Sequence, residues 1–312
     1  MAIQEILDTL GKAINRKPPF CTGTIPVLPD DITLFYKQGG KSAGWLDLSK
    51  ATEDELQALA DACEPATFGL GQRDVLDETY RKAGKMDTDK FAMSLDIVKL
   101  GIVSRVQVQL LEGEDEDKTV NAELYKLNVY GKDSFFKSHK DTPRGDTMFG
   151  SLVVAFPTPY EGGALVLRHD DEEWTFDSAA LTRKQAEPSI AYIAFYSDVD
   201  HEVAVVTFGH RVTLTYNLYL GNTPLRENFP PSVTPVAADD SIFHDALSKA
   251  LADPSFLPNG GYLGFGLSFK YPIDLADGDS TNGHVLKGSD AMIIRVCEKL
   301  SLAPSLNAVY NG

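Results

Sequence analysis

The stretch DHEVAVVTFGHRVTLTYNLYL, residues 200–220, contains two runs of apolar and polar side chains on either side of Gly209-His210. Alternation of this kind is typical of β-strands, and a glycine between two such runs is typical of a tight turn. We therefore predict that the two runs pair as a hairpin. His201 would precede the first strand, and Arg211 would open the returning strand close to it.

The returning strand carries a polar face that needs an explanation. Successive side chains of a strand point to opposite faces, so Arg211, Thr213 and Thr215 share one face, and Val212 and Leu214 share the other. An arginine inside a β-sandwich is costly unless an anion binds to it. We expect a carboxylate there, held in a bidentate fork by the guanidinium.

A second informative stretch, LNVYGKDSFFKSHKD at residues 127–141, ends in the pair His139 and Asp141, 62 residues before His201. Residues i and i+2 of a strand can reach one ion, and two imidazoles with one carboxylate suit Fe(II) with three open positions. Each residue alone also has an ordinary interpretation: a surface turn for either histidine, a strand-edge salt bridge for Arg211. Their joint order favours a metal site.

The rest of the chain predicts a mainly β fold with flanking helices (α+β), a β-sandwich or jelly roll rather than alternating βα units. Strands are predicted at 103–110, 122–130, 150–156, 164–167, 190–196, 203–208 and 212–220. Helices are predicted at 1–20, after the N-cap Thr52 with Glu55 at the third helical position, and at 75–82, 89–100, 240–251 and 289–300. We divide the chain into a helical and loop region (1–100) that buttresses the core, the β core (101–222), and a C-terminal extension (223–312) that could cover the active site.

The composition excludes some classes of function. The 312 residues carry a formal charge of −16, which disfavours binding to nucleic acid. Cys21, Cys63 and Cys297 are odd in number and widely spaced, as reduced thiols are. The sequence shows no signal peptide and no apolar run of the roughly 20 residues that span a bilayer, so we predict a cytoplasmic or nuclear protein. Nothing in the sequence indicates an oligomeric state.

Residues 124–220 resemble the Fe(II)/2-oxoglutarate-dependent dioxygenases, and among them the prolyl 4-hydroxylase-like branch. The resemblance rests on Y-G-x(4)-F-x-x-H-x-D from Tyr130 to Asp141, on G-G-x-L from Gly162, and on a histidine and an arginine ten residues apart, His201 and Arg211. It implies a double-stranded β-helix (a jelly-roll, cupin-like core) with Fe(II) in its mouth. It also implies that decarboxylation of 2-oxoglutarate to succinate and CO2 in the presence of O2 is coupled to oxidation of a C–H bond.

The resemblance also implies roles for single residues. His139, Asp141 and His201 would ligate Fe(II), and Arg211 would pair with the distal carboxylate of 2-oxoglutarate. Tyr130 would donate a hydrogen bond to this co-substrate, unless it is only a half-buried aromatic of its strand. Asn128 forms an N-x-Y pair with Tyr130 that is similar to the alkylated-nucleic-acid demethylases, where both residues touch 2-oxoglutarate. Thr213 would add a supporting hydroxyl.

The substrate is less defined than the chemistry. The family branch favours hydroxylation of a prolyl or other protein side chain. The alternatives are oxidation of a free amino acid or other small metabolite, and a non-catalytic metal-binding or interaction module on the same fold. Arg144 is expected at the pocket rim, as a partner for a substrate carboxylate or as an exposed loop arginine. Trp174 either closes on the substrate or packs over the barrel.

Overall fold

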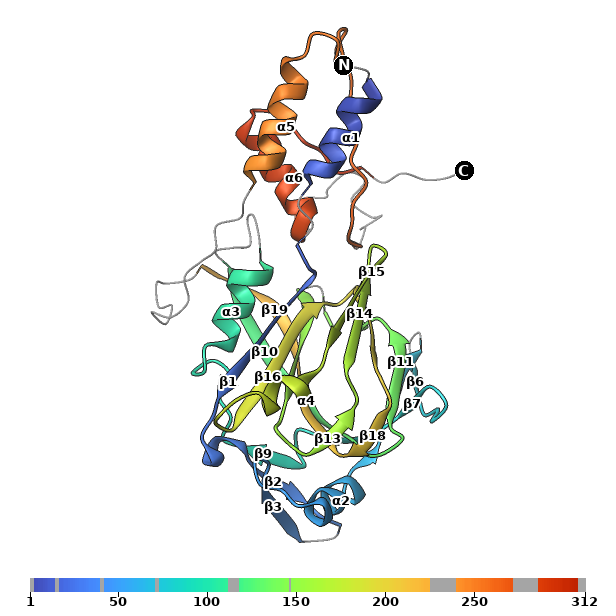
Figure 1. The fold of residues 1–312 in the computed structure, drawn as a ribbon, viewed down its shortest axis with the longest axis vertical. Coiled ribbons are helices and arrows are strands. Elements are labelled where there is room, and N and C mark those ends of the chain that lie inside the picture. Colours follow the sequence, from blue (N-terminus) through green and yellow to red (C-terminus); the bar gives the residue numbers. More distant parts are fainter. Residues whose placement is uncertain are drawn as a thin grey trace. The chain divides into compact units, whose positions relative to one another are not determined.

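The computed structural model forms two compact units, which we call the β unit and the helical unit (Figure 1). The β unit comprises Pro19–Val106 and Thr119–Pro230, and the helical unit comprises Met1–Pro18, Gln107–Lys118 and Pro231–Gly312. The structure describes residues 3–14, 17–39, 42–70, 73–111, 118–145, 147–224, 240–271 and 286–307.

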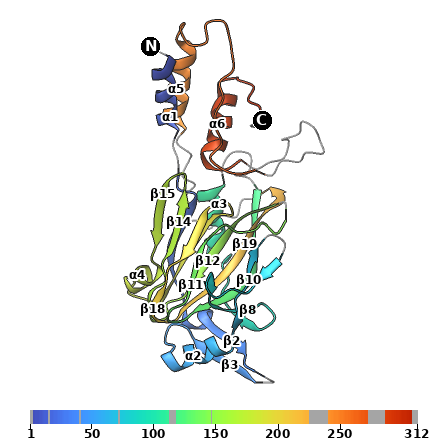
Figure 2. The same cartoon turned by 90° about the vertical axis from the view of Figure 1, so that its right-hand side faces the viewer.

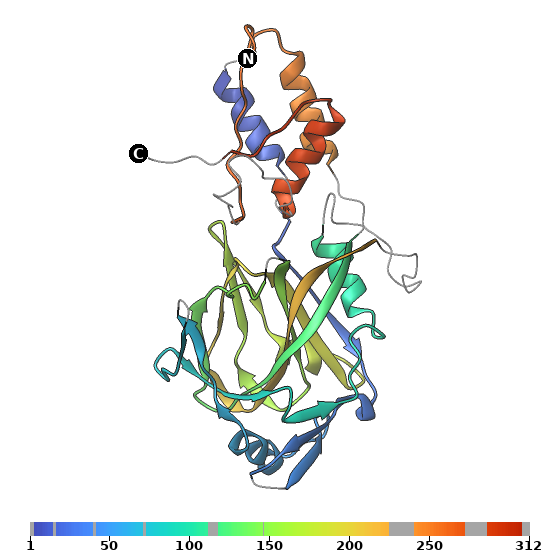
Figure 3. The same ribbon diagram turned by 180° about the vertical axis from the view of Figure 1, so that it is seen from behind.

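Two sheets form the body of the β unit. The larger sheet has seven strands, in the order β1 (Phe20–Pro26), β16 (Ser189–Tyr196), β12 (Met148–Ala155), β19 (Arg211–Pro224), β10 (Lys118–Tyr130), β8 (Gly84–Asp87) and β4 (Glu64–Pro65). The smaller sheet has five, in the order β15 (Glu172–Phe176), β14 (Leu165–His169), β17 (Asp200–Val203), β11 (Phe135–His139) and β7 (Arg81–Lys82). The long strands β10 and β19 run side by side (Figures 2 and 3). This arrangement confirms the predicted double-stranded β-helix.

Smaller elements complete the β unit. They are η1 (Pro29–Ile32), the sheet of β3 (Ala43–Asp47), β2 (Thr33–Lys37) and β9 (Phe91–Met93), the pair β5 (Phe68–Leu70) and β6 (Arg73–Val75), and the helices α2 (Glu53–Asp61) and α4 (Ser178–Arg183). Helix α2 begins as predicted, because the Thr52 hydroxyl accepts a hydrogen bond from the Glu55 N–H while the Glu55 carboxylate accepts one from the Thr52 N–H. All eight residues of β16 are buried, as its continuous apolar run suggests, and α4 contacts this strand.

The predicted hairpin around Gly209 is wrong in its pairing. Strand β18 (Val206–Gly209) pairs with β13 (Tyr160–Gly162), whereas β19 belongs to the larger sheet. The chain therefore passes from one pairing to another at Gly209, whose φ is 67° and whose added Cβ would lie 2.1 Å from the Pro159 carbonyl oxygen. As a result, His201 and Arg211 reach the interior from different sheets.

Three other predictions of local structure are wrong. Residues 103–110 form part of a helix, α3 (Ile102–Leu110), because Ile102, Val106 and Leu110 are buried at helical spacing and Val108 of the apparent alternation is not fully buried. The helices predicted at 75–82 and 89–100 are instead short strands and turns. The apolar residues there are too few to form a helical face, and Phe91 is used in the pairing of β9 with β2.

The helical unit contains three helices that match the predicted positions: α1 (Ile3–Ala13), α5 (Ser241–Ala252) and α6 (Gly288–Lys299). Leu10, Phe243 and Val296, one from each helix, are buried in a single apolar cluster. Across the described residues, no helix combines the length and the apolar character needed to cross a membrane. Residues 225–239 and 272–285 of the predicted C-terminal extension lie outside the described residues.

Candidate active site

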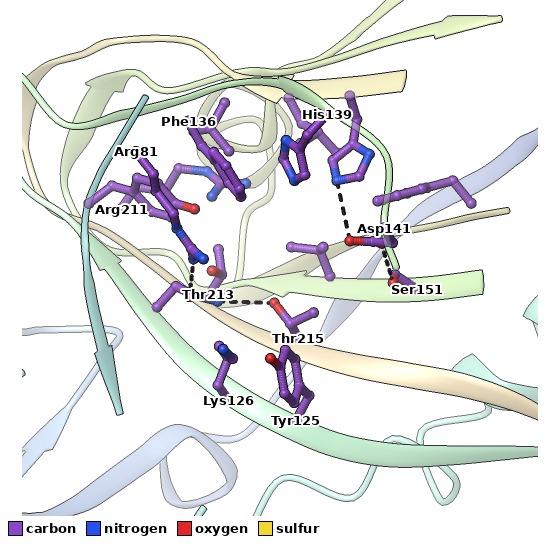
Figure 4. Close-up of a pocket in the computed structure, with 17 residues that line it drawn as sticks. Arg81, Tyr125, Lys126, Phe136, His139, Asp141, Ser151, Arg211, Thr213 and Thr215 are labelled. Atoms are coloured by element: carbon purple, nitrogen blue, oxygen red, sulfur yellow. Dashed lines mark hydrogen bonds and ion pairs between the residues drawn. The ribbon is translucent and has the colours of Figure 1, made fainter. Parts of the chain in front are cut away.

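Two adjoining cavities lie inside the β unit, and Figure 4 shows the narrower of them. The narrow cavity has a volume of about 100 Å³, and its wall includes Tyr130, His201, Arg211 and Thr213. The wide cavity has a volume of about 630 Å³, and its wall includes Thr67, Arg73, Arg144 and Asn217. Both are lined by Arg81, Tyr125, Lys126, Phe136, His139 and Asp141. Residues of both sheets therefore face a common interior.

The predicted metal triad is assembled where the cavities adjoin. His139, the last residue of β11, is the register partner of His201 on β17, and their ring centroids are 4.2 Å apart. Asp141 follows two residues later, with its Oδ1 atom 3.8 Å from the His201 Nε2 atom. Potential ligand atoms of the three residues all lie within 4.8 Å of one another. Such spacing allows one ion to reach all three.

Hydrogen bonds orient the three potential ligands. The Nδ1 atoms lie 2.8 Å from the Lys137 carbonyl oxygen for His139 and 3.1 Å from the Val199 carbonyl oxygen for His201. Each Nδ1–H can donate to its carbonyl, which leaves each Nε2 lone pair for a metal. The Ser151 hydroxyl donates to Asp141 Oδ2 at 2.5 Å. Side chains held this way need little rearrangement to bind an ion.

Burial also favours the metal-binding form of His139. Burial first, and the neighbouring His201 second, lower the pKa of His139 to about 3. The imidazole is therefore neutral at physiological pH, which is the form that coordinates a metal. Two histidines and one carboxylate form a donor set suited to Fe(II).

Arg211 lies at the start of β19 and is only 1% exposed. Its Nε and Nη2 atoms are buried and have no hydrogen-bond partner among the described residues. Its Cζ atom lies 5.6 Å from the centre of the Tyr130 ring. A buried guanidinium with two unused donors is costly in the protein alone. A carboxylate in the narrow cavity would satisfy it.

Thr213 and Tyr130 line the same cavity as Arg211, and both are buried. Asn128 also lines it, but its amide is occupied on both sides. Its Oδ1 atom accepts a hydrogen bond from Arg81 Nη2 at 2.8 Å, and its Nδ2 atom donates one to Thr215 Oγ1 at 3.1 Å. In this arrangement Asn128 positions Arg81.

Arg81 is a site residue that the sequence reasoning missed. It comes from the short strand β7, where the sequence predicts a helix, and no spacing pattern marks it. The side chain is buried, its Nη1 atom donates to the Thr67 carbonyl oxygen at 2.7 Å, and its Cζ atom lies 4.4 Å from the centre of the Phe136 ring. In Figure 4, Arg81 and Arg211 lie beside Phe136, whereas Asp141 and Ser151 lie beyond His139.

The two predicted substrate residues have different surroundings. Arg144 lines the wide cavity, with its Cζ atom 4.4 Å from the centre of the Tyr125 ring and its Nη2 atom donating to the Tyr125 hydroxyl. Trp174 is not among the residues that line either cavity, and its ring packs edge-on against Phe20, with centroids 5.5 Å apart. The structure thus brings Arg144 to the site and leaves Trp174 outside it.

Comparison with known families agrees with this geometry. Residues 125–219 match the sequence model of the 2OG-Fe(II) oxygenase superfamily. This segment contains the triad, Arg211, Tyr130 and Thr213. Residues 125–219 are therefore similar to the Fe(II)- and 2-oxoglutarate-dependent dioxygenases, a superfamily that uses Fe(II), 2-oxoglutarate and O2.

Similar solved structures include a prolyl-4-hydroxylase from Pseudomonas putida, with 17% identity and a TM-score of 0.38 over 69% of this chain and 98% of that chain. Another is a prolyl hydroxylase from Trichoplax adhaerens in complex with a hypoxia inducible factor oxygen degradation domain peptide fragment. It has 14% identity and a TM-score of 0.39, over 69% of this chain and 91% of that chain. No curated protein sequence matches the chain.

Proposed function

We propose that this dioxygenase hydroxylates a prolyl or other side chain of a protein, with 2-oxoglutarate as co-substrate. The observation that carries the proposal is Arg211, whose two unused donors are buried in the same narrow cavity as the triad. A dicarboxylate chelating a metal held by the triad would bring its far carboxylate to such a donor. The prolyl substrate is supported by the motif from Tyr130 to Asp141, which is similar to the prolyl 4-hydroxylase-like branch.

In the proposed mechanism His139, Asp141 and His201 would hold Fe(II). Bound Fe(II) supplies the O2 chemistry that protein side chains lack. Ser151 keeps the Asp141 carboxylate in place through its hydrogen bond to Oδ2. The backbone carbonyls of Lys137 and Val199 do the same for the two imidazoles.

The co-substrate is proposed to lie between the triad and Arg211. Arg211 would bind the distal carboxylate in a bidentate fork, with the hydroxyls of Thr213 and Tyr130 as additional donors. Arg81 lines the same cavity, and its buried Nε atom has no hydrogen-bond partner among the described residues. A second positive charge there lowers the cost of bringing a dianion into the barrel.

Oxidation of a free amino acid or other small metabolite is the second candidate. The wide cavity favours it, because about 630 Å³ lies within the range of small-molecule pockets. A purely non-catalytic module is the least favoured alternative, since such a module has no use for an unpaired buried arginine beside the triad.

The proposed function is tested by turnover. The purified protein is supplied with Fe(II), 2-oxoglutarate and O2, and succinate release is measured over a screen of proline-containing peptides and free amino acids. We expect release above the uncoupled level with one class of compound, and a mass increase of one oxygen atom in the compound that stimulates it. Folded protein that forms no succinate from 2-oxoglutarate, with or without a probe, would contradict the proposal.

Two further proposals concern the whole chain. A cytoplasmic or nuclear location is supported by the three cysteines, none of which forms a disulfide, and is tested by cell fractionation. The division into residues 1–100, 101–222 and 223–312 is tested by hydrogen exchange with and without 2-oxoglutarate. Slower exchange in residues 101–222, which contain the candidate site, is the expected result on binding.

A further inference from the structure

The wide cavity is locally cationic in a strongly acidic protein. Its wall contains the basic residues Arg73, Arg81, Lys126, Lys140 and Arg144, and the acidic residues Asp74, Asp77 and Asp141. Five basic residues therefore face three acidic ones, and the charge of one of these three, Asp141, would be used to bind the metal. The chain as a whole carries a formal charge of −16. A cavity of opposite sign on such a protein favours an anionic ligand.

Some of these cations already have partners. The Lys140 Nζ atom lies 3.3 Å from an Asp200 carboxylate oxygen. Arg81 donates to Thr67 and Asn128. The cations that lack a carboxylate partner among the described residues are therefore more informative about the ligand.

Lys126 is the most unusual of them. Its side chain projects from β10 into the wall shared by both cavities, and the residue is 7% exposed. It has no hydrogen bond or ion pair with any described residue, and its nearest aromatic neighbour is the Tyr125 ring, with the Nζ atom 3.9 Å from the ring centre. Burial, followed by repulsion from Arg81 and Lys85, lowers the pKa of Lys126 to about 8. The side chain is largely buried and its ammonium group lines the cavities without an anion, so an anionic ligand there would offset the cost of burying the lysine.

Arg144 supplies a second cation at the same aromatic ring. Its guanidinium carbon lies 4.4 Å from the centre of the Tyr125 ring, and its Nη2 atom is bonded to the Tyr125 hydroxyl. Tyr125 therefore holds Arg144 at the edge of the cavity that Lys126 lines from within. An anion that enters past Arg144 can end at Lys126.

We propose that the wide cavity binds a carboxylate of the substrate, with Lys126 as its buried partner and Arg144 as its partner at the rim. This inference rests on the proposed function, because it concerns the compound that is oxidised at the neighbouring triad. The carboxylate belongs either to a free amino acid or related small acid, or to an acidic side chain of a peptide. Both sources offer the same group to the two cations.

The test uses the full chain with Fe(II), 2-oxoglutarate and O2, and measures succinate release with pairs of probes that differ in one charge. One arm compares the standard L-amino acids with their amides. The other compares proline-containing peptides that carry glutamate with the same peptides carrying glutamine. We expect an acid in one arm to have a KM about tenfold or more below that of its neutral counterpart, as for one charge-assisted hydrogen bond. The arm that responds identifies the source of the carboxylate.

Variants assign the preference to the two residues. Lys126→Met should remove most of it, Lys126→Arg should retain it, and Arg144→Gln should reduce it by a smaller factor. Lys132→Met is the matched control, because Lys132 is an exposed lysine between β10 and β11 and is not among the residues that line the cavities. This control should leave the preference unchanged.

The two proposals fail in different ways. If the wild-type protein releases no succinate from 2-oxoglutarate, either with or without a probe, the proposed function is contradicted and the carboxylate site with it. If succinate is released but neutral probes serve as well as acids, or no probe in either arm raises the release, only the carboxylate site is overturned. It is also overturned if Lys126→Met keeps the preference.

Discussion

The narrow and the wide cavity share a wall, and they contain two buried cations that differ in chemistry, Arg211 and Lys126. The narrow cavity holds Arg211, whose planar guanidinium can bind a carboxylate through two parallel hydrogen bonds. The wall that the wide cavity shares with the narrow one holds Lys126, an ammonium group whose pKa burial lowers to about 8. The guanidinium of Arg211 suits the carboxylate of a co-substrate that is the same in every turnover, whereas Lys126 binds an anion strongly only while its amine is protonated. We therefore predict that substitution of Arg211 weakens binding of 2-oxoglutarate, whereas loss of the charge of Lys126 weakens binding of the acidic substrate.

The largest separation is expected from Arg211→Met. The variant removes two charge-assisted hydrogen bonds from the proposed co-substrate, so the KM for 2-oxoglutarate should rise by about a hundredfold or more. Stability should change in the opposite direction, by about 1–4 kcal/mol in favour of the variant, because an apolar side chain replaces an unpaired buried charge. Kinetics and urea unfolding measure the two effects. Arg168→Met, on an exposed pair with Glu173, is the control and should change neither strongly.

Ser151→Ala should affect both cavities together. The variant removes the hydrogen bond that orients Asp141, and loss of such an outer partner lowers metal affinity by about 10- to 100-fold. Titration with Fe(II) under anaerobic conditions measures the change. An unchanged Fe(II) affinity in folded Ser151→Ala would show that Asp141 is not held at the metal by this contact.

A smaller effect, on the binding of the acidic substrate, is expected from pH. Lys126 is cationic below its pKa of about 8, so affinity for an anionic substrate should fall as pH rises through 8, approaching tenfold per pH unit. The charged groups that face Lys126 are Arg81, Lys85, Asp87 and Arg144. The KM of the acidic probe measured from pH 7 to 9.5 checks the prediction. The same dependence in Lys126→Met would contradict it.

The smallest effect is expected from Thr213→Val. This variant keeps the shape of a buried side chain but removes one neutral hydrogen-bond donor beside Arg211. One such bond contributes about 0.5–1.5 kcal/mol, so the KM for 2-oxoglutarate should rise by about two- to twelvefold. An effect equal to that of Arg211→Met would mean that Thr213, rather than the guanidinium, dominates co-substrate binding.

The same two cavities differ in how far sequence reasoning reaches them. His139, Asp141, His201 and Arg211 could be predicted because strand alternation and their order along the chain carry the information. The pairing around Gly209 could not, since the choice of partner strand depends on residues far away, such as Pro159 and Tyr160. The sequence therefore predicts the residues of the site more completely than the strand pairing that brings them together.

Arg81 and Lys126 are two residues of the cavities that the sequence analysis does not predict. Arg81 comes from a strand of only two residues, too short for any periodic signal. Lys126 did carry a signal, because it lies two residues before Asn128 and four before Tyr130 on the same face of β10. Because Lys126 alternates with the apolar residues Leu127 and Val129, the pattern indicates a lysine on the face that points into the barrel. The family motif begins only at Tyr130 and does not include this lysine.

The most direct measurement is an anaerobic titration of the purified chain with Fe(II) and then 2-oxoglutarate, followed by visible spectroscopy. A charge-transfer band from chelated 2-oxoglutarate should appear in the wild-type protein, and His139→Ala should abolish it through loss of the metal. Arg211→Met should shift the titration to higher 2-oxoglutarate concentrations while the band itself still forms at saturation. Absence of the band in folded wild-type protein would contradict the assignment of the triad and Arg211 to one metal and co-substrate site.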